Sequence, residues 1–287
     1  PEVPVIVVGN LNVGGTGKTP LTLYLANALS KAGKKVGIAT RGYKGKKSNS
    51  MPYILDETSD AQDYGDEAVY LSRHSNAIVC ICSQRLKAAN LLFERGVDVI
   101  LSDDGLQHFA LKRDLELVVV SSDRAFGNRR LLPAGPLREG LDRLDTIDLI
   151  CLNGKKIDED LHLENTIGFE IENKTAKNIH NGQIRSIDAF INHDVNLIAG
   201  IGDPNVLVQK LIKLGININH IKVADHGAID SSEIKNLQGT SLFLTPKDLV
   251  KYSKDDLPKE TWELIPEMMI DQSQEQSMMN KIFEIIQ

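Results

Sequence analysis

The chain has 287 residues, a formal net charge of −6, 41% hydrophobic residues and 25% charged residues. This composition excludes an intrinsically disordered chain, and the length fits one large domain or two of modest size. An acidic balance provides no general basic field for nucleic acid, so we expect no nucleic-acid partner.

Cysteine content and hydropathy limit the class of protein further. Cys80, Cys82 and Cys151 are too few for a disulfide framework or a four-thiolate zinc site, and we interpret them as reduced core residues of a cytosolic protein. No apolar run approaches the roughly 20 residues that span a bilayer, and no signal peptide is visible.

The first half of the chain alternates between two patterns. Runs that are apolar almost throughout predict strands buried on both faces of a parallel sheet, and striped patterns between them predict helices. The predicted strands are Val5–Val8, Val36–Ala39, Ile78–Ile81, Val97–Leu101, Leu117–Val120 and Leu149–Leu152. The predicted helices are Thr19–Lys31, Asp66–Arg73 and Arg85–Arg95. This alternation indicates a doubly wound α/β domain with a mostly parallel sheet, which we expect to cover residues 1–154.

The second half is organised differently. Residues 155–192 are polar and contain two short alternating stretches, Thr166–Ile171 and Gln183–Phe190, which predict a linker with a small antiparallel ribbon. Residues 193–287 predict a second, smaller α/β domain. Its expected strands are Leu197–Ala199, one near Ile221, and Leu242–Thr245; its expected helices are Asn205–Leu214, one near Ser231–Leu237, and Gln274–Ile286.

A glycine-rich segment directly follows the first predicted strand and opens the first predicted helix. In this context, backbone N–H groups can converge on phosphate oxygens, the lysine can reach the β- and γ-phosphates, and the threonine hydroxyl suits Mg²⁺. The residues that we expect to bind the nucleotide are Asn12, Val13, Gly14, Gly15, Thr16, Gly17, Lys18 and Thr19. Asn12 stands where the full motif has glycine. The segment predicts a site for ATP with Mg²⁺ and makes the first domain one of the P-loop NTPase type.

A second element supports the nucleotide site. The apolar run Val97–Leu101 leads into Asp103 and Asp104, and an aspartate at such a strand end holds Mg²⁺ in phosphate-loop proteins. We therefore expect Thr19, Asp103 and Asp104 to form the metal site.

Two other classes of protein share such a loop. A nucleotide switch of the partitioning or metal-delivery type often has a lysine just before the Gly-Gly pair, where this chain has Val13. A small-metabolite kinase or an ATP-dependent ligase would differ only in its acceptor, so the loop alone leaves the acceptor open.

Longer motifs indicate one particular family of proteins. The segments are PVIVVGNLNVGGTGKTP at 4–20, RGY at 41–43, GDE at 65–67, DDGLQH at 103–108 and GNRRLLPAGPLRE at 127–139, with shorter matches at 200–202, 225–226 and 245–248. With these motifs the chain resembles the tetraacyldisaccharide 4′-kinases over nearly its whole length. The resemblance implies phosphoryl transfer from ATP to the 4′-hydroxyl of a tetraacylated glucosamine disaccharide 1-phosphate, a lipid A precursor.

The resemblance also implies roles for single residues. Asp66 becomes the candidate base for the sugar hydroxyl, and His226 its hydrogen-bonding partner. Lys18 and Arg138 are expected to stabilise phosphoryl charge, and Glu139 joins the metal site. Without the resemblance, Asp66 would be read as an acidic residue that favours a helix N-terminus.

Some positions depart from the family pattern. Arg129 replaces a common glycine, and His226 is followed by Gly227 where the family often has a second histidine. The basic loop residues Arg41, Lys44, Lys46 and Lys47 are candidates to contact the substrate's 1-phosphate or anionic headgroups.

The family further implies a peripheral protein on the cytosolic face of the bacterial inner membrane. Because its hydrophobic N-terminal helix would precede the first strand, and this chain starts at Pro1, we expect a trimmed soluble form and a monomer.

Overall fold

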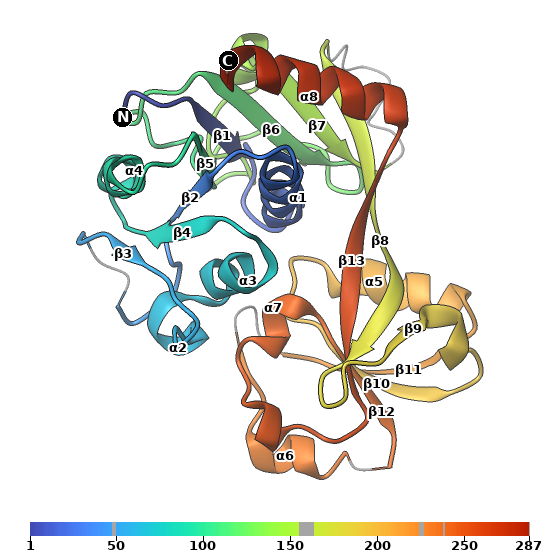
Figure 1. Ribbon diagram of the computed structural model, residues 1–287. Helices are drawn as coiled ribbons and strands as arrows, with labels where there is room; N and C mark the ends of the chain where they lie inside the picture. Colours follow the sequence, from blue (N-terminus) through green and yellow to red (C-terminus); the bar gives the residue numbers. More distant parts are fainter. Residues whose placement is uncertain (48–49, 155–163, 224–226, 238, 287) are drawn as a thin grey trace. The chain divides into compact units, whose positions relative to one another are not determined.

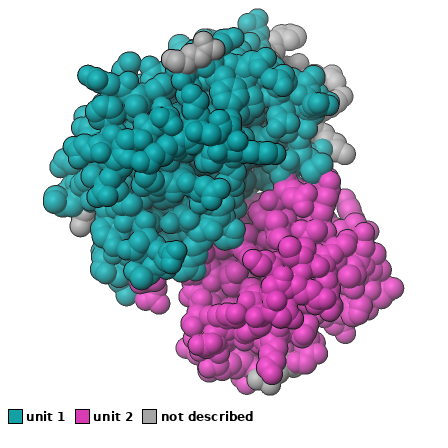
Figure 2. All heavy atoms as spheres, viewed as in Figure 1, with its two compact units in different colours: residues 1–59, 63–171, 268–287 teal, residues 60–62, 172–267 magenta. Residues whose placement is uncertain are grey.

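The computed structural model describes residues 1–47, 50–154, 164–223, 227–237 and 239–286, which form two compact units (Figures 1 and 2). Unit 1 contains residues 1–59, 63–171 and 268–287, and unit 2 contains residues 60–62 and 172–267. These divisions differ from the expected domain boundaries after residues 154 and 192. The long strand β8 (Thr166–Asn178) begins beside a strand of unit 1, and the chain returns to unit 1 for its last helix.

Unit 1 is built on a sheet with the strand order β8-β7-β6-β1-β5-β2-β4-β3. Within the described residues its strands pair in parallel, apart from β3, which is antiparallel to β4. The bounds are β1 (Val5–Gly9), β2 (Val36–Thr40), β3 (Tyr53–Ile54), β4 (Ile78–Ile81), β5 (Val99–Asp103), β6 (Leu115–Ser121) and β7 (Leu149–Asn153). Central strands β1, β2 and β5 are buried throughout, which explains their continuous apolar sequence.

Helices cover both faces of this sheet. Helices α1 (Lys18–Lys31) and α3 (Asp66–His74) contact each other on one face, and α4 (Arg85–Glu94) packs on the other (Figure 1). Connections between parallel strands are right-handed. The chain moves from β1 toward β4 through α1 and α3 and returns to β5 through α4, so α4 lies on the opposite face of the sheet. The remaining helical segments are α2 (Ala61–Tyr64), the 3-10 turn η1 (Leu141–Thr146) and α8 (Gln272–Ile286).

The strand order reverses direction at β1. This strand lies between β5 and β6, so the chain runs to one side of β1 for β2–β5 and to the other side for β6–β8. In open α/β sheets, ligands bind beyond the carboxyl ends of the strands at such a reversal. The glycine-rich loop follows β1 at this point.

Unit 2 contains a smaller parallel sheet with the order β11-β10-β12-β13. Its elements are β9 (Ile184–Ser186), η2 (Ile187–Phe190), β10 (Asp194–Ile198), α5 (Pro204–Lys213), β11 (Asn217–Ile221), α6 (Ser231–Lys235), β12 (Ser241–Leu244), α7 (Pro246–Leu249), η3 (Lys254–Asp256) and β13 (Thr261–Ile270). Phe190 lies in the core of this unit. Its ring centre is 4.8 Å from that of Phe243 and 5.1 Å from that of Trp262.

Most predicted elements are present. The predicted strands and helices of the first half coincide with β1, β2, β4–β7, α1, α3 and α4 to within two residues at each end. An antiparallel ribbon is formed by β8 and β9, but its paired residues begin at Thr175 opposite Ser186. The expected first stretch, Thr166–Ile171, pairs in parallel with β7 instead, and the second stretch ends in the 3-10 turn η2. The predicted interior position of the three cysteines is confirmed, because Cys80, Cys82 and Cys151 are buried and free.

Candidate active site

The glycine-rich loop has the backbone shape of an anion cradle. Gly14 and Gly17 adopt φ values of 103° and 102°, a region that side-chain-bearing residues avoid. Gly17 is the N-cap of α1 and therefore offers no side chain to the helix N-terminus. The first turn of α1, which the structure describes in full, contains no acidic residue. The N–H groups and positive dipole end of α1 are thus available to a phosphate, and ATP fits this loop.

Residues next to the cradle hold its shape. Asn10 follows β1, is fully buried, and donates from Nδ2 to Thr16 Oγ1 at 3.2 Å. On the other side of the loop, Asn153 Nδ2 donates to the Thr16 backbone oxygen at 3.2 Å. Asn10 Oδ1 is buried and has no hydrogen-bond partner within the described part of the chain. A buried acceptor of this kind, beside a cradle of N–H groups, fits a site completed by a ligand.

Asn12 and Val13 connect the glycine-rich loop to a distant segment of the chain through hydrogen bonds. Asn12 is buried and donates from Nδ2 to the Ala125 backbone oxygen at 2.5 Å. The Val13 backbone N–H donates to the Pro136 oxygen at 2.9 Å, while its side chain is 43% exposed. These contacts join the glycine-rich loop to the segment 122–139.

Lys18 and Arg138 meet at one carboxylate. Lys18 Nζ lies 3.5 Å from Asp104 Oδ1, and Arg138 Nη1 lies 2.9 Å from the same oxygen. Burial would raise the pKa of Asp104, but the two cations outweigh it and hold the pKa below its usual value. The structure therefore brings together three predicted site residues from separate motifs, with Asp104 ionised between two positive groups.

Asp103 lies deeper, at the last position of β5. It accepts from Thr22 Oγ1 at 3.1 Å and lies 3.5 Å from Thr40 Oγ1. Burial, followed by the negative charges of Glu67 and Asp104, raises the pKa of Asp103 to about 7. A divalent cation beside this carboxylate would favour its ionised form.

Glu139 belongs to the same cluster through a glutamine. Gln107 Nε2 donates to Glu139 Oε1 at 2.6 Å, and Gln107 Oε1 accepts from Arg138 Nη1 at 3.2 Å. Arg143 Nε also lies 3.4 Å from Glu139 Oε2. The DDGLQH and GNRRLLPAGPLRE segments, which are distant in the sequence, thus meet at the carboxyl edge of the sheet.

The donor set fits magnesium bound together with phosphates. Among the described residues, no group of three or more His, Cys, Asp or Glu side chains is arranged as a ready-made metal site. Mg²⁺ is usually held by one or two carboxylates and by substrate phosphates and water. Asp103 ends β5, Asp104 follows it, and Thr19 lies in the first turn of α1, so these three residues are candidates for such binding.

Asp66 begins α3 and is 5% exposed. Its Oδ1 accepts the backbone N–H of Glu67 at 2.8 Å, and the preceding Gly65 has a φ of 90°. A Cβ atom on Gly65 would lie 2.6 Å from the Tyr43 backbone oxygen, so the RGY segment packs directly against this turn. Its expected partner, His226, lies outside the described residues, so the proposed pair stays a prediction.

Several residues of the site were not predicted. Asn10, Thr22 and Gln107 form hydrogen bonds with predicted site residues. Asn10 and Gln107 could have been found from the sequence, because polar side chains beyond buried strands mark the functional edge of a sheet. Arg85 is 2% exposed and donates to the backbone oxygens of Cys82 and Asp103. In the sequence it is an ordinary charged residue at a helix start, so no pattern indicated its burial.

The departure at Arg129 has a backbone consequence. Arg129 has a φ of 58°, in the left-handed region where glycine is favoured. The common glycine of the family therefore matches the local conformation, and arginine adopts the same conformation at a cost of about 1–2 kcal/mol.

These features define a class of protein. A glycine-rich loop between a central parallel strand and a helix, with acidic residues at the end of the neighbouring strand, is the site of a P-loop enzyme that handles a nucleoside triphosphate. The family model described as tetraacyldisaccharide-1-P 4′-kinase matches residues 1–284. The chain belongs to this family, and the lipid A kinase resemblance inferred from its motifs is confirmed.

Individual relatives agree with the family match. A tetraacyldisaccharide 4′-kinase of Aliivibrio salmonicida is 38% identical, over 99% of this chain and 83% of its own length. The enzyme of the same name from Colwellia psychrerythraea is 42% identical, over 92% of this chain and 77% of its own length. A crystal structure of LpxK from Aquifex aeolicus in complex with ATP has a TM-score of 0.81 and 28% identity, covering 100% of this chain and 90% of that one.

Within the residues that the structure describes, no helix combines the length and apolar character needed to cross a membrane.

Proposed function

We propose that the chain transfers the terminal phosphoryl group of ATP to the 4′-hydroxyl of a tetraacylated glucosamine disaccharide 1-phosphate. The bond between the γ-phosphorus and the β,γ-bridging oxygen breaks, a bond to the sugar oxygen forms, the hydroxyl proton leaves, and ADP is released. Family membership and the names of the relatives support this acceptor, and the ATP complex of the structural neighbour supports the donor.

The observation that carries the proposal is the meeting of Lys18 and Arg138 at Asp104. Phosphoryl transfer needs alignment and neutralisation of charge on the equatorial oxygens far more than covalent help from the protein. Two cations at the same carboxylate oxygen, one of them from the first turn of a helix with no side-chain cap, would supply positive charge to the γ-phosphate. Lys18 would orient the β- and γ-phosphates, and Arg138 would stabilise the transferring group.

A bound Mg²⁺ would neutralise phosphate charge. We assign its binding to Thr19, Asp103 and Asp104, with Glu139 as a further carboxylate. Gln107 keeps Glu139 next to Arg138, so a substitution of either partner would disturb both.

Asp66 is our candidate for the base that accepts the proton of the 4′-hydroxyl. A sugar hydroxyl is a poor nucleophile near neutral pH, so a positioned carboxylate helps as the proton leaves. The burial of Asp66 and its closeness in sequence to Glu67, whose charge acts on Asp103, support a place beside the metal site. We propose that His226 hydrogen-bonds to this carboxylate and orients it.

The acceptor is a lipid, so we propose that the protein works as a peripheral protein on the cytosolic face of the inner membrane, as a monomer. The basic loop that follows β2 would contact the 1-phosphate or anionic headgroups. Arg41, Lys44, Lys46 and Lys47 are the candidates in this loop, and Lys47 forms an ion pair with Asp63.

An acceptor-dependence assay tests the proposal. The purified chain with Mg²⁺ and ATP should release ADP at a rate that rises by at least about tenfold when the tetraacylated disaccharide 1-phosphate is added in detergent micelles. Lys18→Ala should abolish the increase. ADP release that is indifferent to the glycolipid, or that responds instead to a soluble sugar, would contradict the proposed acceptor.

A further inference from the structure

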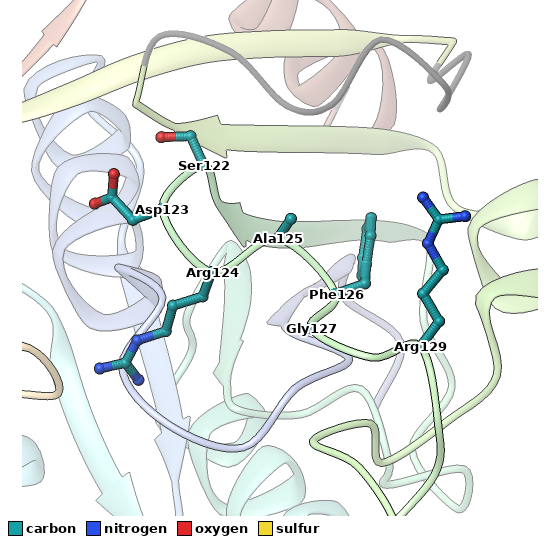
Figure 3. Close-up of a pocket in the computed structure, with 7 residues that line it drawn as sticks. All are labelled: Ser122, Asp123, Arg124, Ala125, Phe126, Gly127 and Arg129. Carbon is teal, nitrogen blue, oxygen red and sulfur yellow. The ribbon is translucent and has the colours of Figure 1, made fainter.

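Two connections between parallel strands of unit 1 contain no α-helix, although a helix is the usual connection. Residues 104–114, between β5 and β6, form turns and irregular structure, and residues 122–148, between β6 and β7, contain only the 3-10 turn η1; the structure describes both segments in full. Residues 122–129 of the second connection line a cavity of about 380 Å³ (Figure 3). Both connections contain residues of the candidate active site, whose positions therefore depend on contacts other than those of a helix.

The guanidinium group of Arg113 holds the first connection. Its Nη1 donates to the Leu106 backbone oxygen at 2.9 Å, and its Nη2 donates to the His108 backbone oxygen at 2.7 Å. These oxygens belong to the residues on either side of Gln107, so one guanidinium group fixes the backbone that carries the Gln107 side chain. The planar fork of N–H donors allows both contacts at once.

Arg143, in η1, holds the second connection. Its Nε lies 3.4 Å from Glu139 Oε2, and its Nη2 lies 2.5 Å and 2.6 Å from the two carboxylate oxygens of Glu116. The other oxygen of Glu139, Oε1, accepts from Gln107 Nε2 at 2.6 Å. The Glu139 carboxylate is thus held from both connections, by Gln107 at one oxygen and by Arg143 at the other.

Glu116, the second residue of β6, joins the two arginines. Its Oε1 accepts from Arg113 Nη1 at 2.7 Å as well as from Arg143. Burial would raise the pKa of Glu116, but its hydrogen bonds to the two arginines outweigh burial and lower the pKa. Its backbone N–H donates to Asp148 Oδ2 at 2.8 Å. A buried, ionised carboxylate on a strand inside the sheet is therefore the common anchor of both arginines.

We propose that Glu116 is a positioning residue for phosphoryl transfer, and that it acts through Arg113 and Arg143. The two arginines set the positions of Gln107 and Glu139, which lie on different connections and meet only through side chains. The inference rests on the proposed kinase function of this site, and it goes further by assigning a role to a network that does not itself contact the substrate.

The consequence for the reaction lies at Arg138, which we assigned to the transferring phosphoryl group. Gln107 Oε1 accepts from Arg138 Nη1 at 3.2 Å, so a displaced Gln107 displaces the arginine. A misplacement of about 1 Å in such a group can cost about 100-fold in rate. The glycine-rich loop is held separately, by Asn10 and Asn153 at Thr16, so ATP binding should depend little on the network.

Glu116→Gln tests the role, because it keeps the size of the side chain and removes the charge. The kcat of glycolipid-dependent ADP release should fall at least about tenfold, while the Kd for ATP in titration calorimetry stays within about threefold. Lys112→Ala is the matched control: it removes a charge next to Arg113, its side chain is 75% exposed, and it pairs with Asp114. It should leave both quantities within about twofold.

Two results in Glu116→Gln would overturn the inference. An unchanged kcat would show that the network does not act on the reaction, and equal losses of kcat and ATP affinity would show a general loss of structure.

Arg113→Lys is a second, milder variant. Lysine keeps the positive charge beside Glu116, but its single ammonium group lacks the fork that binds the oxygens of Leu106 and His108 together. We expect kcat to fall at least about fivefold, again with the Kd for ATP within about threefold. Full activity in Arg113→Lys would show that charge alone suffices, and would overturn the positioning role.

Hydrogen exchange tests the network without the acceptor. The backbone N–H groups of His108 and Leu111 donate at 3.0 Å to the oxygens of Gly105 and His108, so their exchange reports on the first connection. Peptides covering residues 105–111 should exchange at least about fivefold faster in Glu116→Gln and Arg113→Lys, and at the wild-type rate in Lys112→Ala. Wild-type exchange in both network variants would overturn the inference. Faster exchange in a protein whose wild type phosphorylates no glycolipid would support the network and contradict only the proposed acceptor.

Discussion

Asp104 combines two unusual properties in one residue. Its φ of 49° lies in the left-handed region, which costs a residue with a side chain about 1–2 kcal/mol. Its carboxylate is at the same time the meeting point of Lys18 and Arg138. Backbone strain at the end of a central strand is retained where the surrounding structure fixes it, and such positions concentrate at functional sites. The geometry of Asp104 thus independently supports the assignment made from its sequence motif.

Asp66→Ala separates proton transfer from nucleotide binding. We expect kcat to fall by about 10²–10⁴, because the sugar hydroxyl loses its general base, while the Kd for ATP stays nearly the same. Steady-state kinetics and titration calorimetry measure the two quantities. Glu57→Ala, at an exposed acidic position of the same unit, should change neither. His226→Ala should reduce kcat less than Asp66→Ala does. A loss of ATP affinity as large as the loss of rate would assign Asp66 to binding instead.

His108 should titrate far below the usual range of histidine. Burial, followed by the positive charges of Arg85 and Arg41, lowers its pKa to about 4. The unfolded chain then takes up this proton first as the pH falls below about 6.5. The stability that His108 contributes is therefore present above pH 6.5 and is lost as the pH falls toward 4.

NMR titration of the imidazole measures this pKa, and urea unfolding at pH 7 and pH 5 measures the linked stability. His108→Gln should lose less stability between the two pH values than the wild type. A His108 resonance that titrates near 6.5 would contradict the described surroundings.

Sequence patterns predicted the ionic part of the site better than its buried support. Lys18 and Asp104 lie in motifs whose chemistry follows from residue type and order, and Arg138 was singled out through the family resemblance. The structure brings the three side chains together. Thr22 and Arg85 support Asp103 through contacts between residues 81 and 18 positions apart. Such contacts depend on which strands are neighbours, and no local pattern of residues encodes that.

The loop between β1 and α1 gives a prediction at the scale of an element. Gly17→Ala should raise the Kd for ATP by at least about tenfold, because a side chain there is strained at φ 102° and its Cβ would lie 2.9 Å from Asn153 Nδ2. Gly33→Ala, near the other end of α1, is the control: its φ is 83°, and nothing lies within 4 Å of the new Cβ. Both variants should lose about 1–2 kcal/mol of stability.

Calorimetric binding and thermal unfolding distinguish the two effects. If Gly33→Ala weakens ATP binding as much as Gly17→Ala does, the loss comes from general destabilisation and the cradle is not the binding element.

Elements with a strong periodic pattern were predictable, and β13 was not. Thr261–Ile270 includes Pro266, and a proline within an apolar run argues against a strand because it cannot donate to the ladder. β13 pairs with β12 from Thr261 to Glu263, ahead of the proline. Tertiary context therefore overrides the local signal at this element.

At the scale of the whole molecule, the chain crosses between its units more often than its composition suggests. Composition changes after Asn153, yet unit 1 continues to residue 171 and regains residues 268–287. Tyr24 of α1 hydrogen-bonds to Glu275 of α8, so the last helix is tied to the helix that follows the glycine-rich loop. A linear reading of the sequence cannot detect such a return, because the returning segment looks like the end of the domain that precedes it.

The position of the new phosphate on the product tests the central claim most directly. After reaction of the purified chain with Mg²⁺, ATP and the tetraacylated disaccharide 1-phosphate, two-dimensional ³¹P–¹H NMR of the glycolipid should show the original 1-phosphate and one new phosphomonoester coupled to the proton at C4′. A new phosphate at any other hydroxyl, or ATP converted to ADP and free phosphate with the glycolipid unchanged, would contradict the account.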